Sequence, residues 1–329
     1  MRKLSAAALG LLLLCSCAGP EPSSSSQSSA DESGMPSSSV LPEESGDKTV
    51  SFTDALGREI TLSAPERVAA LGGSFAETWV LAGGSLAAAT SDAWEERGLE
   101  LDDSSVQNLG GQQEPNAELL LLSEPDLVIA NASVSGHIAL EPQLTAAGVT
   151  VAYFEVEVFE DYLSMLETCC ELTGREDLYE QNGLAVSGQI EAQRARAQGK
   201  DAPTVLLLRA YSSGVKVKNS RNNMTGAMLA DLGCVNIADG DETLLEELSL
   251  ERILSADPDY IFVTTMGSST EKAMQSMEEL LTGNPAWASL SAVSGGQYHV
   301  LPKDLFHYKP NARWGEAYEM LADILYPAQ

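Results

Sequence analysis

The chain has 329 residues, 44% of them hydrophobic, and carries 48 acidic against 19 basic residues, a formal net charge of −29. Its length predicts about two domains, and its charge excludes nucleic acid as a natural partner, because binding phosphates requires a basic face. The spacing of its cysteines and histidines fits neither a disulfide framework nor a metal site, so we expect no resident metal and no cofactor.

The first 48 residues predict export and attachment to a membrane. A basic start and the apolar run 4–14 are typical of a signal peptide, residues 1–16, that is too short to span a bilayer. The sequence Leu14-Cys15-Ser16-Cys17 resembles the bacterial lipobox, so Cys17 is expected to carry the lipid. Residues 17–48 are rich in serine and lack aromatic residues, as a disordered tether would be. We expect an extracytoplasmic protein held at the outer face of the cell membrane by the lipid alone; cleavage to a soluble product is the alternative.

Short apolar runs alternate with helical patterns in the rest of the chain. In residues 49–175 we predict strands at 67–73, 86–91, 126–130 and 149–154, and helices at 77–82, 118–123, 140–147 and 161–172. In residues 201–329 we predict strands at 204–210, 260–266 and 297–301, and helices at 224–232, 273–281 and 312–325. Such alternation predicts an α/β fold with mostly parallel sheets flanked by helices. Residues 176–200 contain few helix breakers and are predicted to form one long helix between two lobes.

One pattern occurs twice. Asn116-Ala117-Glu118 leads through leucines to Pro125-Asp126 and an apolar run, and Ser249-Leu250-Glu251 leads in the same way to Pro258-Asp259. Each copy predicts a short helix with Asn or Ser as its N-cap, ending before proline and followed by a buried strand. The copies lie 133 residues apart, so we predict two similar lobes with a ligand cleft between them.

This repeat, with the stretches 52–60 and 65–71, resembles the class III solute-binding proteins of ABC importers over residues 49–329. The resemblance implies a cargo such as a ferric siderophore, haem or cobalamin, and a single long helix that keeps lobe closure small. It also implies a monomer that docks on a permease dimer with a cytoplasmic ATPase, each lobe using one surface glutamate. Those positions match Glu118 and Glu251.

Candidate ligand-binding residues lie in the loops after the predicted strands, because ligands of open α/β sheets bind at the carboxyl ends of the strands. Residues 306–314 combine aromatic, histidine, lysine and arginine side chains, and Arg209 ends a strand rich in leucine. As an alternative to ligand binding, residues 310–311 could cap the helix 312–325. We interpret Trp314 as a core residue. The candidates are Ser74, Trp94, Arg209, Tyr211, Lys218, Arg221, Met266, His307, Tyr308, Lys309 and Arg313.

We find no signature of catalysis: no nucleophile elbow, no phosphate-binding glycine loop and no His–Glu helix motif. The basic residues near one lobe's cleft favour an anionic cargo, a ferric siderophore first and haem next. For haem, His307, Tyr308, Met266 or His137 could supply the axial ligand. The alternatives are a cobalamin-binding protein of the same importer class, and a cell-surface sensor or adhesion lipoprotein that reuses the fold.

Overall fold

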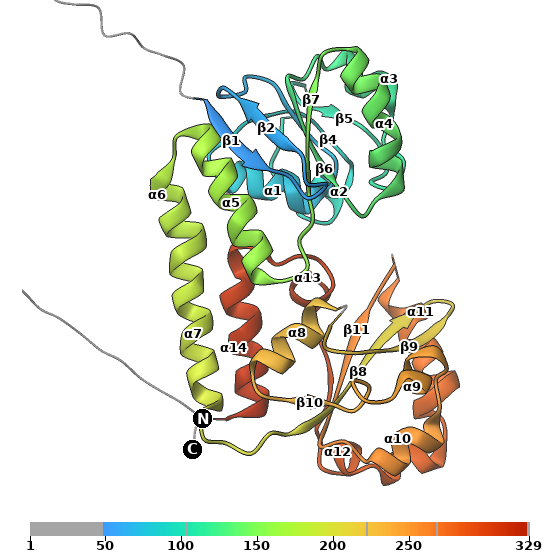
Figure 1. Cartoon of the computed structure of the whole chain (residues 1–329). Coiled ribbons are helices and arrows are strands. Elements are labelled where there is room, and N and C mark those ends of the chain that lie inside the picture. The colour runs from blue at the N-terminus through green and yellow to red at the C-terminus, as the bar shows by residue number, and fades with distance from the viewer. Residues whose placement is uncertain (1–48, 103, 222, 268, 328–329) are drawn as a thin grey trace, which may run out of the picture. The chain divides into compact units, whose positions relative to one another are not determined.

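The computed structural model of the chain describes residues 49–102, 104–221, 223–267 and 269–327. The signal peptide, Cys17 and the tether lie outside these residues. The described residues belong to one compact unit that holds two α/β lobes (Figure 1). The predicted fold class is confirmed.

The N-terminal lobe contains a parallel sheet of five strands in the order β5-β4-β3-β6-β7. Four strands were expected from the sequence; the fifth, β5, has only two residues and no apolar pattern. The elements are β3 (Val68–Ala70), α1 (Gly73–Leu81), β4 (Leu86–Ala89), α2 (Asp92–Glu95), β5 (Gln107–Asn108), α3 (Ala117–Leu122), β6 (Leu127–Asn131), α4 (Ser135–Ala146) and β7 (Thr150–Phe154).

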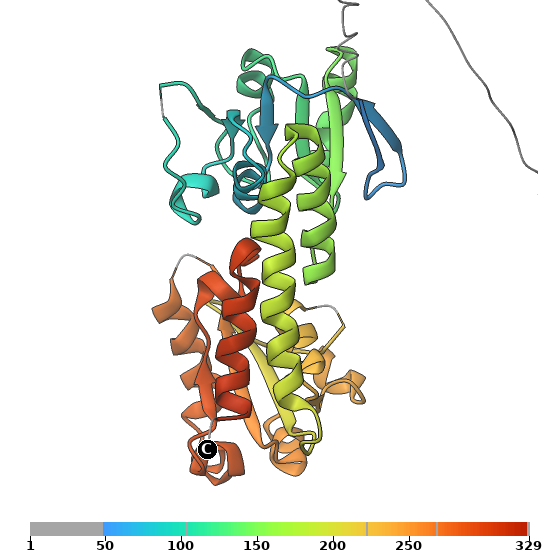
Figure 2. The same ribbon diagram turned by 90° about the vertical axis from the view of Figure 1, so that its left-hand side faces the viewer.

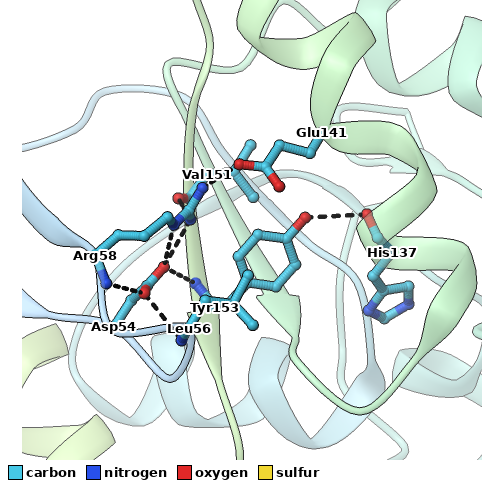
Figure 3. Close-up of polar contacts among 7 residues, drawn as sticks. All are labelled: Asp54, Leu56, Arg58, His137, Glu141, Val151 and Tyr153. Carbon is cyan, nitrogen blue, oxygen red and sulfur yellow. Dashed lines mark hydrogen bonds and ion pairs between the residues drawn. The ribbon is translucent and has the colours of Figure 1, made fainter.

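An antiparallel hairpin of β1 (Val50–Thr53) and β2 (Glu59–Leu62), which the sequence analysis did not predict, precedes this sheet. Asp54 and Arg58 fasten it to the lobe (Figure 3). Arg58 donates to the carbonyl oxygen of Val151 at 2.7 Å and pairs with Glu141, while Asp54 accepts from the backbone N–H of Tyr153 at 3.3 Å. Burial acts to raise the pKa of Asp54, but hydrogen bonds from Arg58 and Tyr153 outweigh it and lower the pKa.

A long helix leads from the first lobe to the second. It consists of α6 (Glu176–Tyr179), a π-helical turn (Glu180–Leu184) and α7 (Ala185–Ala197), close to the predicted range of 176–200. It follows α5 (Phe159–Thr173), on which Cys169 and Cys170 are both buried and unbonded, as expected for packing residues. The C-terminal helix α14 (Trp314–Leu325) runs beside α7 (Figure 2).

The C-terminal lobe contains parallel strands in the order β10-β8-β11-β12, and β9 pairs antiparallel with β8. The sequence analysis did not predict β9: β8 continues to Tyr211 and the chain turns back at Gly214, so the sheet is mixed. The strands are β8 (Thr204–Tyr211), β9 (Gly214–Lys218), β10 (Val235–Asn236), β11 (Tyr260–Thr265) and β12 (Tyr298–Val300). The helices are α8 (Met224–Asp231), α9 (Glu242–Glu246), α10 (Leu250–Ala256), α11 (Thr270–Met277) with a π-helical end (Glu278–Thr282), α12 (Ser291–Ser294) and α13 (Lys303–Phe306), with 3-10 turns at Pro285–Ser289 and Asn311–Arg313.

The repeated pattern forms the same local structure in both lobes. Asn116 caps α3 by accepting from the backbone N–H groups of Glu118 and Leu119, and Ser249 caps α10 by accepting from the N–H of Arg252. The residue before each proline, Glu124 or Asp257, has a positive φ, of 47° and 39°. The repeat therefore reflects one shared helix-to-strand unit.

The aspartate of each Pro-Asp pair has a structural role that the sequence analysis did not foresee. Asp126 accepts from the backbone N–H groups of Glu66 and Arg67 at 2.7 and 3.1 Å, just before β3. Asp259 accepts from the N–H and the hydroxyl of Thr204 at 2.7 and 2.8 Å, where β8 begins. Each aspartate thus ties the start of one strand to the start of its neighbour.

The apolar core connects the lobes. One cluster of buried side chains includes Trp79 from α1, Phe159 from α5, Ile190 from α7, Leu207 from β8 and Trp314 from α14. The rings of Phe159 and Trp314 meet edge to face, with centroids 6.0 Å apart. Each sheet has a further cluster on its other face. Trp314 is 1% exposed, as its interpretation as a core residue requires.

Candidate ligand-binding site

A cavity of about 380 Å³ is lined by residues of both lobes, and we call it the main cavity below because of this position. The N-terminal lobe contributes Ser74 at the start of α1, together with Arg97, Gln112 and Asn131; the C-terminal lobe contributes Met266, Lys303, His307, Tyr308 and Lys309. These residues lie at the ends of helices and strands or in the loops between them, as expected for a ligand site between α/β lobes.

The position of Ser74 depends on a close approach between two helices. Asp92 of α2 accepts from the backbone N–H of Gly73 at 2.6 Å and holds the N-terminus of α1 at the cavity. A Cβ atom on Gly73 would lie 2.7 Å from the backbone of Asp92, so only glycine fits here.

A second, inner pocket of about 210 Å³ adjoins the main cavity. Its lining includes Arg209 from β8, Asn223 before α8 and Glu157 from the β7–α5 connection. His307 and Lys309 line both spaces. We call it the inner pocket below.

Charge in the inner pocket is mostly positive. Burial, together with the nearby charges of Arg209, Lys303 and Lys309, lowers the pKa of His307 to about 4, so its imidazole is neutral at pH 7. Burial also lowers the pKa of Lys309, and Glu157 partly offsets this. Two cations and a neutral imidazole therefore face a space whose lining contains one carboxylate.

Tyr308 is held between charged groups. Burial and a hydrogen bond with Glu96 raise the pKa of its phenol, so the free site presents a neutral hydroxyl. The ammonium group of Lys303 lies 4.6 Å from the centre of the Tyr308 ring and donates to the carbonyl oxygen of Gly267 at 2.8 Å. These contacts fix the orientation of the ring at the cavity wall.

Six of the candidates line the two spaces: Ser74, Arg209, Met266, His307, Tyr308 and Lys309. Trp94 lines a different cavity of about 630 Å³, beside Arg67 in the N-terminal lobe. The geometry of α2 explains this difference. Asp92 and Glu96 lie about one helical turn apart on the face toward the main cavity, whereas Trp94 lies on another face of the helix. Trp94 therefore lies outside the linings of the main cavity and the inner pocket.

Four other candidates also lie outside these two linings. Tyr211 lines a small pocket at the β8–β9 hairpin, because the strand continues past the expected loop. Lys218 is half-buried at the end of β9, and Arg221 is exposed near the carbonyl oxygen of Asp239. Arg313 is exposed and pairs with Asp304 and Glu316 at 2.8 and 2.7 Å.

His137 does not fit the role of an axial ligand. It is completely buried, its Nδ1 accepts from the backbone N–H of Asn131 at 3.0 Å, and its Nε2 lies 2.7 Å from the carbonyl oxygen of Gln112. Both ring nitrogens thus have protein partners. The hydroxyl of Tyr153 donates to the carbonyl oxygen of His137 at 3.1 Å, so this histidine is part of the scaffold (Figure 3).

Several lining residues were missed. Arg97 lies in an acidic stretch that resembles a surface segment, yet it lines the main cavity and pairs with Glu77. Asn223 was not among the candidates, yet it lines the inner pocket. The basic cluster that contains Lys303 was a signal that could have identified this lysine.

Glu118 and Glu251 are exposed in the first turns of α3 and α10, one on each lobe. Neither lines the two spaces described above.

Among the described residues, no three His, Cys, Asp or Glu side chains are grouped to hold a metal ion. In the same part of the chain, no helix has both the length and the apolar character needed to cross a membrane.

Comparisons with known proteins place the chain in a family. Residues 68–305 match the family described as periplasmic binding protein. The Fe(3+)-citrate-binding protein YfmC of Bacillus subtilis is 25% identical over 297 residues, which cover 89% of this chain and 88% of that protein. The iron-uptake system-binding protein of the same organism is 24% identical, covering 64% of this chain and 63% of that protein.

Solved structures show the same fold. The siderophore-binding protein BauB, bound to ferric iron and two molecules of acinetobactin, has a TM-score of 0.68 at 16% identity and covers 85% of this chain and 99% of that chain. A periplasmic heme-binding protein of Pseudomonas aeruginosa has a TM-score of 0.64 at 24% identity, covering 80% and 94%. The chain therefore belongs to the periplasmic binding protein family, the class III solute-binding proteins of ABC importers, whose members bind solutes and are not enzymes.

Proposed function

We propose that this protein is the substrate-binding lipoprotein of an ABC importer, which captures an iron chelate and delivers it to the permease. The observation that carries the proposal is a group of basic side chains at the cleft. In a chain with a net charge of −29, Arg209, Lys303 and Lys309 line two neighbouring spaces between the lobes. The carboxylates of Asp92 and Glu96 also line the main cavity, but Asp92 accepts from the N–H of Gly73 and Glu96 bonds with Tyr308. The basic side chains favour an anionic ligand.

The relatives favour iron as the cargo metal. One curated relative is an Fe(3+)-citrate-binding protein and another belongs to an iron-uptake system. We therefore propose a ferric siderophore or related ferric chelate first and haem second, with cobalamin as the third choice. In each case the chelate is cargo and not a resident cofactor. For haem, we propose His307, Tyr308 or Met266, which line the main cavity, as the axial ligand.

The signal sequence and the serine-rich segment support a lipid anchor. We propose that residues 1–16 are removed, that Cys17 is lipidated and that residues 17–48 tether the lobes to the outer face of the cell membrane. We also propose that Glu118 and Glu251 dock on the two permease subunits. Their exposure on equivalent helices of the two lobes supports this role.

A thermal-shift screen against ferric siderophores, ferric citrate, haemin, cobalamin and molybdate tests the cargo class. A ligand at a hundredfold excess over its Kd stabilises the protein by about 2.7 kcal/mol. We expect shifts with ferric chelates, and absorption spectra then separate haem, through its Soret band, from siderophores. A response to a sugar, peptide or glycan alone would instead support a cell-surface sensor.

A further inference from the structure

The cavity of about 630 Å³ beside Trp94 lies at the end of the N-terminal sheet that faces away from the cleft. Arg67 and residues 104–106 of its lining precede the parallel strands β3 and β5, whereas Gln112 and Asn131 of the main cavity follow or end strands. We call it the Trp94 cavity below. It shares no described lining residue with the main cavity or the inner pocket. Its volume lies within the range of about 300–1,000 Å³ that is usual for small-molecule sites.

A β-bulge forms part of the wall of the Trp94 cavity. Val68 of β3 pairs with Leu86 of β4, but the next residue, Ala69, pairs with Ala88. Ala87 is therefore an extra residue in β4, and it lines the cavity. Bulges are rare between parallel strands, and they are frequent at sheet edges and beside functional sites. A larger side chain at position 87 would take up part of the space.

Trp94 differs from the other tryptophans of the chain. Trp79, Trp287 and Trp314 are 2%, 4% and 1% exposed, whereas Trp94 is only half-buried. It packs partly against the apolar core and also lines the cavity. A partly exposed indole offers a ligand a broad, flat apolar surface.

The polar part of the lining offers several acceptors. The hydroxyls of Ser104 and Ser105 donate to oxygens of Asp102 at 2.7 and 3.2 Å, so their lone pairs remain to accept. The side chain of Gln107 donates from Nε2 to the carbonyl oxygen of Asn108 at 3.0 Å, which leaves its Oε1 to accept. Asn108 supplies a donor, because its Oδ1 accepts from a backbone N–H at 2.8 Å and its Nδ2 remains to donate.

Arg67 is the only charged side chain among the described residues of this lining. Its Nε donates to the carbonyl oxygens of Ser123 and Glu124 at 3.1 and 3.0 Å, which holds the guanidinium at the end of α3. A lining without a described carboxylate offers a cation no charge partner. A single guanidinium among several acceptors suits an anion poorly, because those acceptors need a ligand that donates. The lining therefore favours an uncharged ligand with hydroxyl groups.

We propose that the Trp94 cavity is a second binding site, which takes an uncharged sugar. The hydroxyls of a sugar ring donate to acceptors such as Gln107 and accept from donors such as Arg67, and its apolar C–H face packs on the indole of Trp94. This site is additional to the cleft and does not depend on the cargo of the cleft. A free sugar and a sugar unit of a glycan chain share this chemistry.

Two variants test the site while the fold is kept. Trp94→Leu removes the aromatic face but retains an apolar side chain against the core. Ser105→Tyr fills the cavity from an exposed position. Ser289→Tyr is the matched control: Ser289 is exposed in the C-terminal lobe and, like Ser105, its hydroxyl donates to a carbonyl oxygen three residues earlier. Melting temperatures verify that each variant folds.

The probes are glucose, its carboxylate analogue glucuronate, and choline as a permanent cation. Saturation-transfer NMR measures their Kd values for every variant. We expect the wild-type chain to bind glucose at least about fivefold more tightly than either charged probe, and Trp94→Leu and Ser105→Tyr to weaken glucose binding about 5- to 10-fold. The control should bind glucose like the wild type. Because Trp94 is the only partly exposed tryptophan, glucose should also protect the fluorescence of the wild-type chain from acrylamide quenching.

Cellotetraose separates the two sources of the sugar. Tighter binding of cellotetraose than of glucose supports a glycan chain, and equal binding supports a free sugar. Absence of glucose binding, equal binding of the charged probes, or unchanged glucose binding in both variants would overturn the second site. Competition between glucose and ferric citrate would place the sugar in the cleft and would also overturn it. Failure of the chain to bind any ferric chelate or haemin would refute the proposed function and leave this inference standing.

Discussion

Asn311 of the C-terminal lobe donates a hydrogen bond from Nδ2 to the carbonyl oxygen of Ser74 in the N-terminal lobe, at 2.9 Å. The same nitrogen lies 2.6 Å from a carboxylate oxygen of Glu77, which also pairs with Arg97 at the main cavity. Asn311 is 1% exposed and has a φ of +51°. It does not cap α14, one of the roles considered for 310–311, but links the lobes beside the ligand site.

Replacing Asn311 should destabilise the protein by breaking this link. Glycine adopts the positive φ without strain, so Asn311→Gly isolates the lost hydrogen bonds, and we expect the free energy of unfolding to fall by about 1–3 kcal/mol. In Asn311→Ala the free energy of unfolding should fall by about 1–2 kcal/mol more, since the Cβ of alanine disfavours a positive φ. Urea unfolding measures both. A glycine variant as stable as the wild type would show that the link contributes nothing.

Reversing the charge of either surface glutamate should impair uptake but not binding. Glu118→Arg or Glu251→Arg should leave cargo affinity within a few tenths of a kcal/mol, because neither residue lines the cleft, while uptake into cells falls. Glu271→Arg is a matched control: Glu271 is also exposed in the first turn of a serine-capped helix, α11. Loss of cargo binding in the first two variants, or equal loss of uptake in the control, would contradict a docking role.

Cys17→Ser should prevent lipid attachment. We expect the protein to appear in the culture medium or to accumulate as an unprocessed precursor, because the rest of the chain is too acidic to adhere to an anionic membrane. Cell fractionation with immunoblotting measures the distribution, and Cys15→Ser is the control. Normal processing and membrane retention of the Cys17 variant would refute the anchor.

Acid should destabilise the fold through His307. An unfolded histidine protonates near pH 6.5, whereas folded His307 stays neutral until about pH 4, so the unfolded state binds more protons between these values. Stability therefore falls as pH drops through this window, by up to about 3 kcal/mol at about 1.4 kcal/mol per pKa unit. His307→Gln should remove this part of the slope. Urea unfolding of both proteins at about pH 7 and about pH 4.5 tests this, and identical pH profiles would contradict it.

The aspartates of the repeated pattern should stabilise the fold through the hydrogen bonds that their carboxylate oxygens accept. Asp126→Ala and Asp259→Ala each leave two donors without their acceptor, so we expect a loss of about 1–2 kcal/mol in each variant. Asp126→Asn and Asp259→Asn keep one carbonyl oxygen and should retain part of that stability. Thermal unfolding compares the two series, and asparagine variants as unstable as the alanine ones would show that charge, not hydrogen bonding, matters.

Elements with strong local signals were predictable. The caps Asn116 and Ser249 and the apolar strands after Pro125 and Pro258 lie where the pattern placed them. The hairpin at residues 50–62 was not predicted, because it depends on the long-range pairing of Arg58 with Glu141. Strand β9 was missed for the same reason, since its alternation is short and its pairing partner decides its conformation.

Some site residues were predictable from their place after a strand. Others were not, because the rotation of a helix determines which of its side chains face the cavity. His307, Tyr308 and Lys309 line the cavity, although the short helix α13 separates them from the last strand. Trp94 was chosen for its type, but α2 turns Asp92 and Glu96 toward the cavity instead. Composition could not reveal that rotation. Asn223 carries no local sequence signal for the site, because only the fold brings it into the same lining as Arg209.

The shared apolar core has a consequence for folding. Because Ile190 of the long helix and Trp314 of α14 belong to the same cluster as side chains from both sheets, neither lobe holds a complete set of apolar neighbours by itself. Unfolding one lobe would expose core surface of the other, which couples their stabilities. The two lobes should thus melt together in a single cooperative transition, and an isolated half of the chain would not retain its native packing.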